Sequence, residues 1–189
     1  FCLAAKDKYG PINLNRSIKL IINKIKKTNT KSISLNIDNI ISKKLAISLE
    51  HIVSSIENGL YKYSYKNEKV AVKIKKCSFV SKNFIPSKIF NSLTLTGKAI
   101  SNGIKLAKDL GNTPPNICTP TYLSDEARKL KKINKLIKIT VLDEAKMKSL
   151  GMGSLLSVSQ GSKQPAKLVS IEYMPLKNKA PIVLVGKGI

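Results

Sequence analysis

The sequence predicts an α/β fold, because segments with the period of a strand alternate along the chain with segments with the period of a helix. Hydrophobic residues make up 42% of the 189 residues, which is enough for a core and argues against global disorder. Residues 112–120, NTPPNICTP, contain two adjacent prolines that a helix cannot continue. This segment is therefore the best candidate for a domain boundary.

The first half of the chain predicts two helices and two strands. Asn15 is the expected N-cap of a helix that ends near Lys26. Residues 32–37, SISLNI, and residues 70–76, VAVKIKK, alternate apolar and polar residues as half-buried strands do. A second helix opens at Ser42, and its apolar residues form one stripe: Leu45, Leu49, Ile52, Val53, Ile56 and Leu60.

A third helix is expected over residues 91–111, with Gly111 as the left-handed residue that ends it. Its apolar face is expected to carry Leu95, Ala99, Gly103, Ala107 and Leu110. After the boundary, Thr119 is an N-cap with Pro120 at the first helical position, which predicts a helix through about Lys132.

The last third predicts three strands and a short helix. The strands are residues 137–142, IKITVL, residues 167–173, KLVSIEY, and residues 181–185, PIVLV. Asp143 caps the short helix, and Gly151 closes it. Between them lies a mixed apolar and loop stretch with no assigned element.

The net charge of +23 first suggests a nucleic acid or an anionic membrane as partner. Of the basic residues, however, only Arg16 and Arg128 are arginine, the side chain that reads base edges with two donors at once. The lysines are scattered along the whole chain, which favours solvated faces over a dedicated nucleic-acid surface. No apolar run approaches the ~18 residues of a membrane span.

Three cysteines, Cys2, Cys77 and Cys118, are an odd number without CxxC spacing. They argue against a disulfide framework and a cysteine zinc site, and they fit a reducing, cytosolic setting. Residues 1–10 lack the pattern of a signal peptide, and Phe1 in place of Met indicates that the start of the protein is missing.

Few residues stand out for chemistry on their own. A phosphate-binding loop around Lys187 would need glycine where Pro181 stands and Ser or Thr where Gly188 stands, so that motif is rejected. Asp143 and Glu144 are explained by helix capping and the helix dipole. His51 falls opposite the apolar stripe, where a solvated histidine is a poor metal ligand or base. On motif grounds alone, Lys187 is a solvated turn residue.

Four segments carry a resemblance to a known family. They are residues 56–66, IENGLYKYSYK, residues 107–123, AKDLGNTPPNICTPTYL, residues 141–165, VLDEAKMKSLGMGSLLSVSQGSKQP, and residues 184–189, LVGKGI. From Ile56 to the end, the chain resembles the leucyl aminopeptidases, also called cytosol aminopeptidases. Gly111 departs from the many members that carry a larger residue before Asn-Thr-Pro.

The resemblance implies a metal site just past the end of this chain. In the family, VGKGI continues into a Thr-Phe-Asp-Ser-Gly-Gly stretch that begins a site for two divalent ions, manganese or zinc, held by carboxylates and one lysine. That lysine matches Lys187, which is the expected metal ligand. The remaining ligands and the catalytic residues would lie beyond residue 189, so this chain alone is expected to be inactive.

The chemistry of Lys187 is compatible with that role. A lysine binds a metal only as the neutral amine, a form that burial and a nearby dication favour. The apolar strand expected at 181–185 would supply the burial, and its carboxyl end is where open α/β sheets bind ligands. Two metals would then activate a bridging water and polarise the scissile carbonyl.

The resemblance also implies an organisation and partners. Residues 1–90 would be part of an N-terminal α/β domain, residues 91–111 a linking helix, and residues 112–189 the start of the catalytic domain. The complete protein would be a cytoplasmic homo-hexamer acting on peptides. Two alternatives stay open: a DNA-binding role of the oligomer, as some bacterial members have, or a short protein without a catalytic half.

Overall fold

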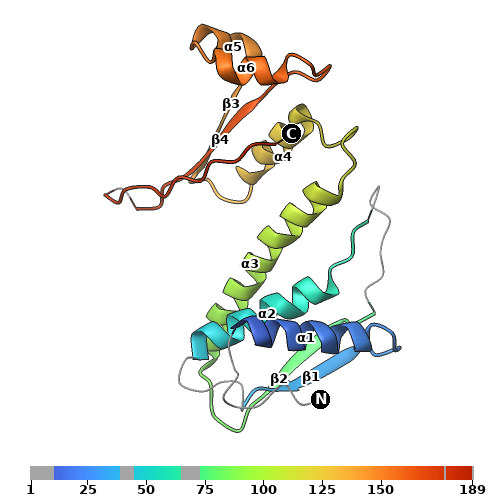
Figure 1. Ribbon diagram of the computed structural model, residues 1–189. Coiled ribbons are helices and arrows are strands. Elements are labelled where there is room, and N and C mark those ends of the chain that lie inside the picture. Colours follow the sequence, from blue (N-terminus) through green and yellow to red (C-terminus); the bar gives the residue numbers. More distant parts are fainter. Residues whose placement is uncertain (1–10, 39–44, 65–72, 177, 189) are drawn as a thin grey trace. The chain divides into compact units, whose positions relative to one another are not determined.

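The computed structural model describes residues 11–38, 45–64, 73–176 and 178–188 (Figure 1). The chain divides into two compact units, Phe1–Asn112 and Thr113–Ile189, which we call unit 1 and unit 2. Both units combine helices with strands, which confirms the α/β prediction. Within the described ranges, no helix is long and apolar enough to cross a membrane.

Unit 1 is a pair of parallel strands covered by helices (Figure 1). Its elements are α1 (Pro11–Ile25), β1 (Ser32–Asn36), α2 (Leu45–Leu60), β2 (Lys76–Val80) and α3 (Ser87–Asn112). The strands pair from Ser32 opposite Lys76 to Asn36 opposite Val80. Helix α2 connects the two strands and packs against both α1 and α3. The unit is therefore built on a βαβ motif.

The core of unit 1 confirms the apolar stripe predicted for α2. Leu49 and Ile52 are fully buried, and Val53 and Ile56 are nearly so. The side chain of Leu45 lies outside the described residues. Leu49 and Val53 pack with Leu93 of α3. Ile52 and Ile56 instead pack with Ile18 and Ile22 of α1, together with Ile37 and partly buried residues of β1 and β2: Ile33, Leu35, Cys77 and Phe79. Burial of this cluster is the main stabilising contribution within the unit.

Two predicted boundaries in unit 1 are wrong. Helix α1 begins at Pro11 rather than at Asn15, since proline is tolerated in the first turn, where its missing N–H has no partner to lose. The Asn15 side chain instead accepts a hydrogen bond from Ser55 Oγ on α2. Strand β2 lies at residues 76–80 rather than 70–76, because its backbone pairs with β1 only from Lys76, opposite Ser32, to Val80, opposite Asn36. Residues 70–72 lie outside the described residues.

The predicted face and end of α3 are also wrong. The buried residues of α3 are Leu93, Gly97 and Ser101, whereas Leu95 from the predicted face is 66% exposed. The small residues Gly97 and Ser101 are buried because they let α3 approach α2 closely. Gly111 does not end the helix, which continues through Asn112. The separate prediction that Gly151 closes the short helix after Asp143 is confirmed, since Gly151 has a left-handed φ of 73°.

The described residues of unit 2 form an antiparallel strand pair and three helices. The elements are α4 (Pro120–Leu130), β3 (Ile137–Leu142), α5 (Glu144–Ser149), α6 (Gly153–Ser159) and β4 (Leu168–Tyr173). The strands pair from Ile137 opposite Tyr173 to Leu142 opposite Leu168. The predictions for β3, β4 and α5 are confirmed, and α6 occupies the stretch that the sequence left unassigned.

The strand predicted at 181–185 is absent from the described residues. Residues 178–188 form no helix or strand, and Ile182, Val183, Leu184 and Val185 are 74% to 93% exposed. An apolar run becomes a strand only when a neighbouring strand accepts its backbone hydrogen bonds, and none of the described strands pairs with it. The hydrophobic pattern of residues 181–185 alone is therefore not enough to predict a strand.

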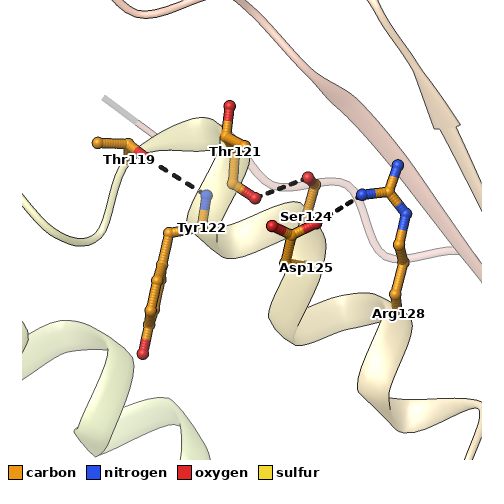
Figure 2. Close-up of polar contacts among 6 residues, drawn as sticks. All are labelled: Thr119, Thr121, Tyr122, Ser124, Asp125 and Arg128. Carbon is orange, nitrogen blue, oxygen red and sulfur yellow. Dashed lines mark hydrogen bonds and ion pairs between the residues drawn. The ribbon is translucent and has the colours of Figure 1, made fainter.

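Thr119 caps α4 as the sequence predicts, which Figure 2 shows. Its backbone is extended, with φ of −79° and ψ of 166°, and its hydroxyl accepts a hydrogen bond from the backbone N–H of Tyr122 at 3.3 Å. Further along the helix, Ser124 Oγ donates to the Thr121 carbonyl at 2.8 Å, and Arg128 forms an ion pair with Asp125 at 2.6 Å. Since both partners of that pair are more than half exposed, the ion pair adds little stability.

The cap makes a direct prediction for α4. Thr119→Ala should destabilise the start of the helix by about 1 kcal/mol, because the Tyr122 amide loses its acceptor. Hydrogen exchange of the Tyr122 amide measures this loss. Thr121→Ala is the matched control, since the exposed Thr121 side chain does not cap the helix and only its carbonyl is used. Equal exchange in both variants would contradict the role of the Thr119 hydroxyl.

Candidate functional site

Lys187, the residue singled out by the sequence, lies in the extended segment after β4. It is exposed, as are all residues from Pro181 to Gly188. A Cβ added at Gly186 or Gly188 would meet nothing within 4 Å, so neither glycine is needed here for a close approach. The Lys187 amine is therefore not enclosed by other described residues.

The described residues do not bring a metal-ligand set together. No group of three or more His, Cys, Asp or Glu side chains within the described ranges could hold a metal ion. A divalent ion needs several oxygen, nitrogen or sulfur donors at once. A single amine on an open segment cannot supply them, so the residues described here do not fit a metal centre by themselves.

Two acidic residues at the start of α5 stabilise the part of unit 2 that precedes residues 178–188. Asp143 caps α5 by accepting a hydrogen bond from the Lys146 backbone N–H at 2.9 Å, as predicted. Glu144 does more than complement the helix dipole. Its Oε1 accepts a hydrogen bond at 2.8 Å from the backbone N–H of Ala166, just before β4. This bond joins residues far apart in sequence, and no sequence pattern signals it.

The segment between α3 and α4 forms a compact turn. Ile117 and Cys118 both donate their backbone N–H to the Pro114 carbonyl at 2.9 Å, and Thr119 donates to the Ile117 carbonyl at 2.7 Å. This turn leads directly into the Thr119 cap and the Pro120 start of α4. The two prolines therefore have a structural role in separating the helices, as the sequence predicts.

Cys77 and Cys118 are free thiols that are half-buried in the structure, whereas Cys2 lies outside the described residues. Burial, with a smaller contribution from the Glu57 carboxylate, raises the pKa of the Cys77 thiol. A raised pKa disfavours the thiolate, which is the nucleophilic form. Cys77 packs against the core of unit 1, where its surroundings favour the neutral thiol.

Comparison with known proteins shows which family the second half of the chain resembles. Residues 105–189 match the family model described as cytosol aminopeptidase family, catalytic domain. The probable cytosol aminopeptidase of Nitrosococcus oceani is 46% identical over 143 residues, which are 73% of this chain and 28% of that protein. The cytosol aminopeptidase of Pseudomonas aeruginosa is 43% identical over 141 residues, with the same coverage.

Solved structures show the same fold at much lower identity. A mutant of tomato leucine aminopeptidase matches 86% of this chain and 33% of its own, with a TM-score of 0.74 and 19% identity. The bottromycin maturation enzyme BotP matches 89% of this chain and 35% of its own, with a TM-score of 0.70 and 19% identity. At these identities the likeness supports the fold alone.

The match in sequence is therefore what assigns the family. The chain spans 28% of the length of its relatives from Nitrosococcus and Pseudomonas, so it corresponds to part of such a protein. The matched region includes the segments that carried the resemblance after Lys105, with the proline turn, the α5 cap and Lys187 among them. Residues 105–189 of this chain belong to the catalytic domain of the cytosol aminopeptidase family.

Proposed function

We propose that the complete protein is a metal-dependent aminopeptidase that removes N-terminal residues such as leucine from peptides. The observation that carries this proposal is the match of residues 105–189 to the catalytic domain of the cytosol aminopeptidase family. The 43–46% identity to proteins named cytosol aminopeptidase over 73% of the chain supports it. No second function is proposed, since no observation on the described residues favours DNA binding.

The proposed cofactor is a pair of divalent ions, manganese or zinc. Support for a metal comes from the family and from one structural neighbour, BotP, whose structure is described as a complex with Mn. Such ions supply Lewis-acid activation of water and of the scissile carbonyl. Lys187 is proposed to supply one ligand to these ions, through its side-chain amine. Because the described residues form no metal site, no catalytic step is derived from them.

We also propose the organisation that the resemblance implies. Residues 1–90 would belong to the N-terminal domain, residues 91–111 to a linking helix, and residues 112–189 to the start of the catalytic domain. The division of the chain between Asn112 and Thr113 supports a boundary at that point. A cytoplasmic location, supported by the relatives' names, and a homo-hexamer of the complete protein remain proposals.

The 189-residue chain makes a sharp test of the metal proposal. We expect the purified chain to show no hydrolysis of leucine amides above background with added manganese or zinc, because one lysine cannot hold a dication. The complete protein, assayed in parallel, should hydrolyse them and lose activity with a chelator. Chelator-sensitive activity in the short chain would contradict the assignment of the missing ligands. An inactive, metal-loaded complete protein would contradict the proposed function.

A further inference from the structure

Helix α3 extends far past its fully buried part. Its last buried residue is Ser101, yet the helix continues to Asn112, where the chain leaves unit 1. At 1.5 Å per residue, this extension is roughly 16 Å long, or about three turns. Helix ends without tertiary contacts fray, so the last turn of α3 needs another source of order.

Tyr61 contacts this last turn from the end of α2. Its hydroxyl donates a hydrogen bond to Asp109 Oδ1 at 2.8 Å and accepts one from Asn112 Nδ2 at 3.1 Å. A single hydroxyl therefore joins two residues of α3 that lie three positions apart, on the same side of the helix. Because the Asp109 acceptor is a carboxylate, the first of these bonds is of the stronger, charge-assisted kind.

Lys108 adds a second connection between the same helices. Its Nζ donates to Asn58 Oδ1 at 3.1 Å and lies 4.9 Å from the centroid of the Tyr61 ring. Asn58 in turn donates to the Ser54 carbonyl at 2.9 Å, which holds its amide in place. A cation over a tyrosine face is attracted to the ring, so Lys108 also restricts the Tyr61 side chain.

We propose that the side chains of Asn58, Tyr61, Lys108, Asp109 and Asn112, which we call the junction network, fix the last turn of α3 onto the end of α2. The network thereby sets the point from which the chain leaves unit 1 at Asn112. This inference goes beyond the proposed peptidase activity and does not depend on it. Tyr61 is the central member, since its hydroxyl bonds to two residues and its ring contacts a third.

The protonation state of Tyr61 agrees with this role. Burial, and then the hydrogen bond to Asp109, raise the pKa of the Tyr61 hydroxyl above its usual value. A tyrosine with its usual pKa of about 10 is already protonated at neutral pH, and the upward shift keeps the hydroxyl a donor to Asp109 at higher pH as well. Its lone pairs remain available to the Asn112 amide.

Hydrogen exchange on the 189-residue chain tests the network. In Tyr61→Phe, both bonds of the hydroxyl are lost while the ring is kept, so the amides of residues 108–112 should exchange roughly tenfold faster. The amides around Leu93 to Ser101 should exchange as in the parent chain, because their protection rests on apolar packing. Tyr173→Phe, which removes an exposed hydroxyl in unit 2, is the matched control and should change neither region.

A second pair of variants separates the network from a general effect on stability. Asp109→Leu should also speed exchange at residues 108–112, and combining it with Tyr61→Phe should add little, since both changes break the same bond. Fully additive effects would overturn the proposal, as would unchanged exchange of residues 108–112 in Tyr61→Phe. Faster exchange spread evenly over α2 and α3 would overturn it too, because the hydroxyl would then stabilise the whole unit.

Discussion

The complete protein should lose peptidase activity by orders of magnitude when Lys187 is replaced by alanine. Loss of one donor leaves an open coordination position on a metal, which water then fills without the geometry of the lysine ligand. The more exchangeable of the two proposed metal ions should also bind more weakly. Each lost decade of rate corresponds to ~1.4 kcal/mol of activation free energy, so this is the largest effect expected from a single substitution.

Lys187→Arg should be nearly as damaging as the alanine variant. The guanidinium group stays protonated at any accessible pH, so arginine keeps the positive charge but cannot donate a lone pair to a cation. The comparison therefore separates metal ligation from a purely electrostatic role. If charge alone mattered, the arginine variant would retain most of the activity.

The measurement is steady-state kinetics with metal titration on both variants. Circular dichroism serves as the folding control, and it should be unchanged because Lys187 is exposed in the structure. Lys179→Ala is the matched substitution, since Lys179 is an exposed lysine of the same segment. Near-normal activity and metal content in Lys187→Arg would show that Lys187 is a turn residue and not a ligand.

The elements that sequence predicted best are those with local signals. Thr119 followed by Pro120 marks the start of α4, and Asp143 marks the start of α5, because a cap acts on amides two or three residues away. The left-handed Gly151 follows α5 for the same reason. Strand β3 has both a clear alternating pattern and a partner within the chain, so pattern and structure agree.

The elements that sequence mispredicted depend on distant partners. The apolar run at 182–185 matches the pattern of a buried strand, but no described strand pairs with it. Likewise, the face of α3 that packs on α2 is chosen by fit between helices, so Gly97 and Ser101 are buried and Leu95 is not. Hydrophobicity alone cannot identify a contact that small residues make.

For the candidate site, too, sequence predicts what lies close along the chain but not what distant residues contribute. Sequence resemblance could single out Lys187, because the motif around it is continuous along the chain. It could not give the surroundings of the amine, since a metal site is made by residues that are far apart in sequence. Among the described residues no such cluster forms, and the role of Lys187 stays a prediction.

Gly97→Ala should destabilise unit 1 by about 2 kcal/mol, because overpacking a close helix contact costs roughly 1–3 kcal/mol. A Cβ at this position would lie 2.7 Å from the backbone oxygen of Glu50 and 2.9 Å from Val53 Cβ. The first of these atoms is backbone, so the clash cannot be relieved by rotating a side chain. Helices α2 and α3 would have to move apart, which would also loosen the cluster of Leu49, Val53 and Leu93.

Gly103→Ala is the matched control, with the opposite expected sign. Gly103 lies on the same helix, but a Cβ there would meet nothing within 4 Å. Alanine is a better helix former than glycine by about 1 kcal/mol, so this variant should stabilise α3. Native-state hydrogen exchange of the α2 and α3 core amides reports both changes within unit 1, independently of unit 2. If both alanine variants were stabilising by the same amount, Gly97 would not be a close contact, and the packing of α3 on α2 through its small residues would be wrong.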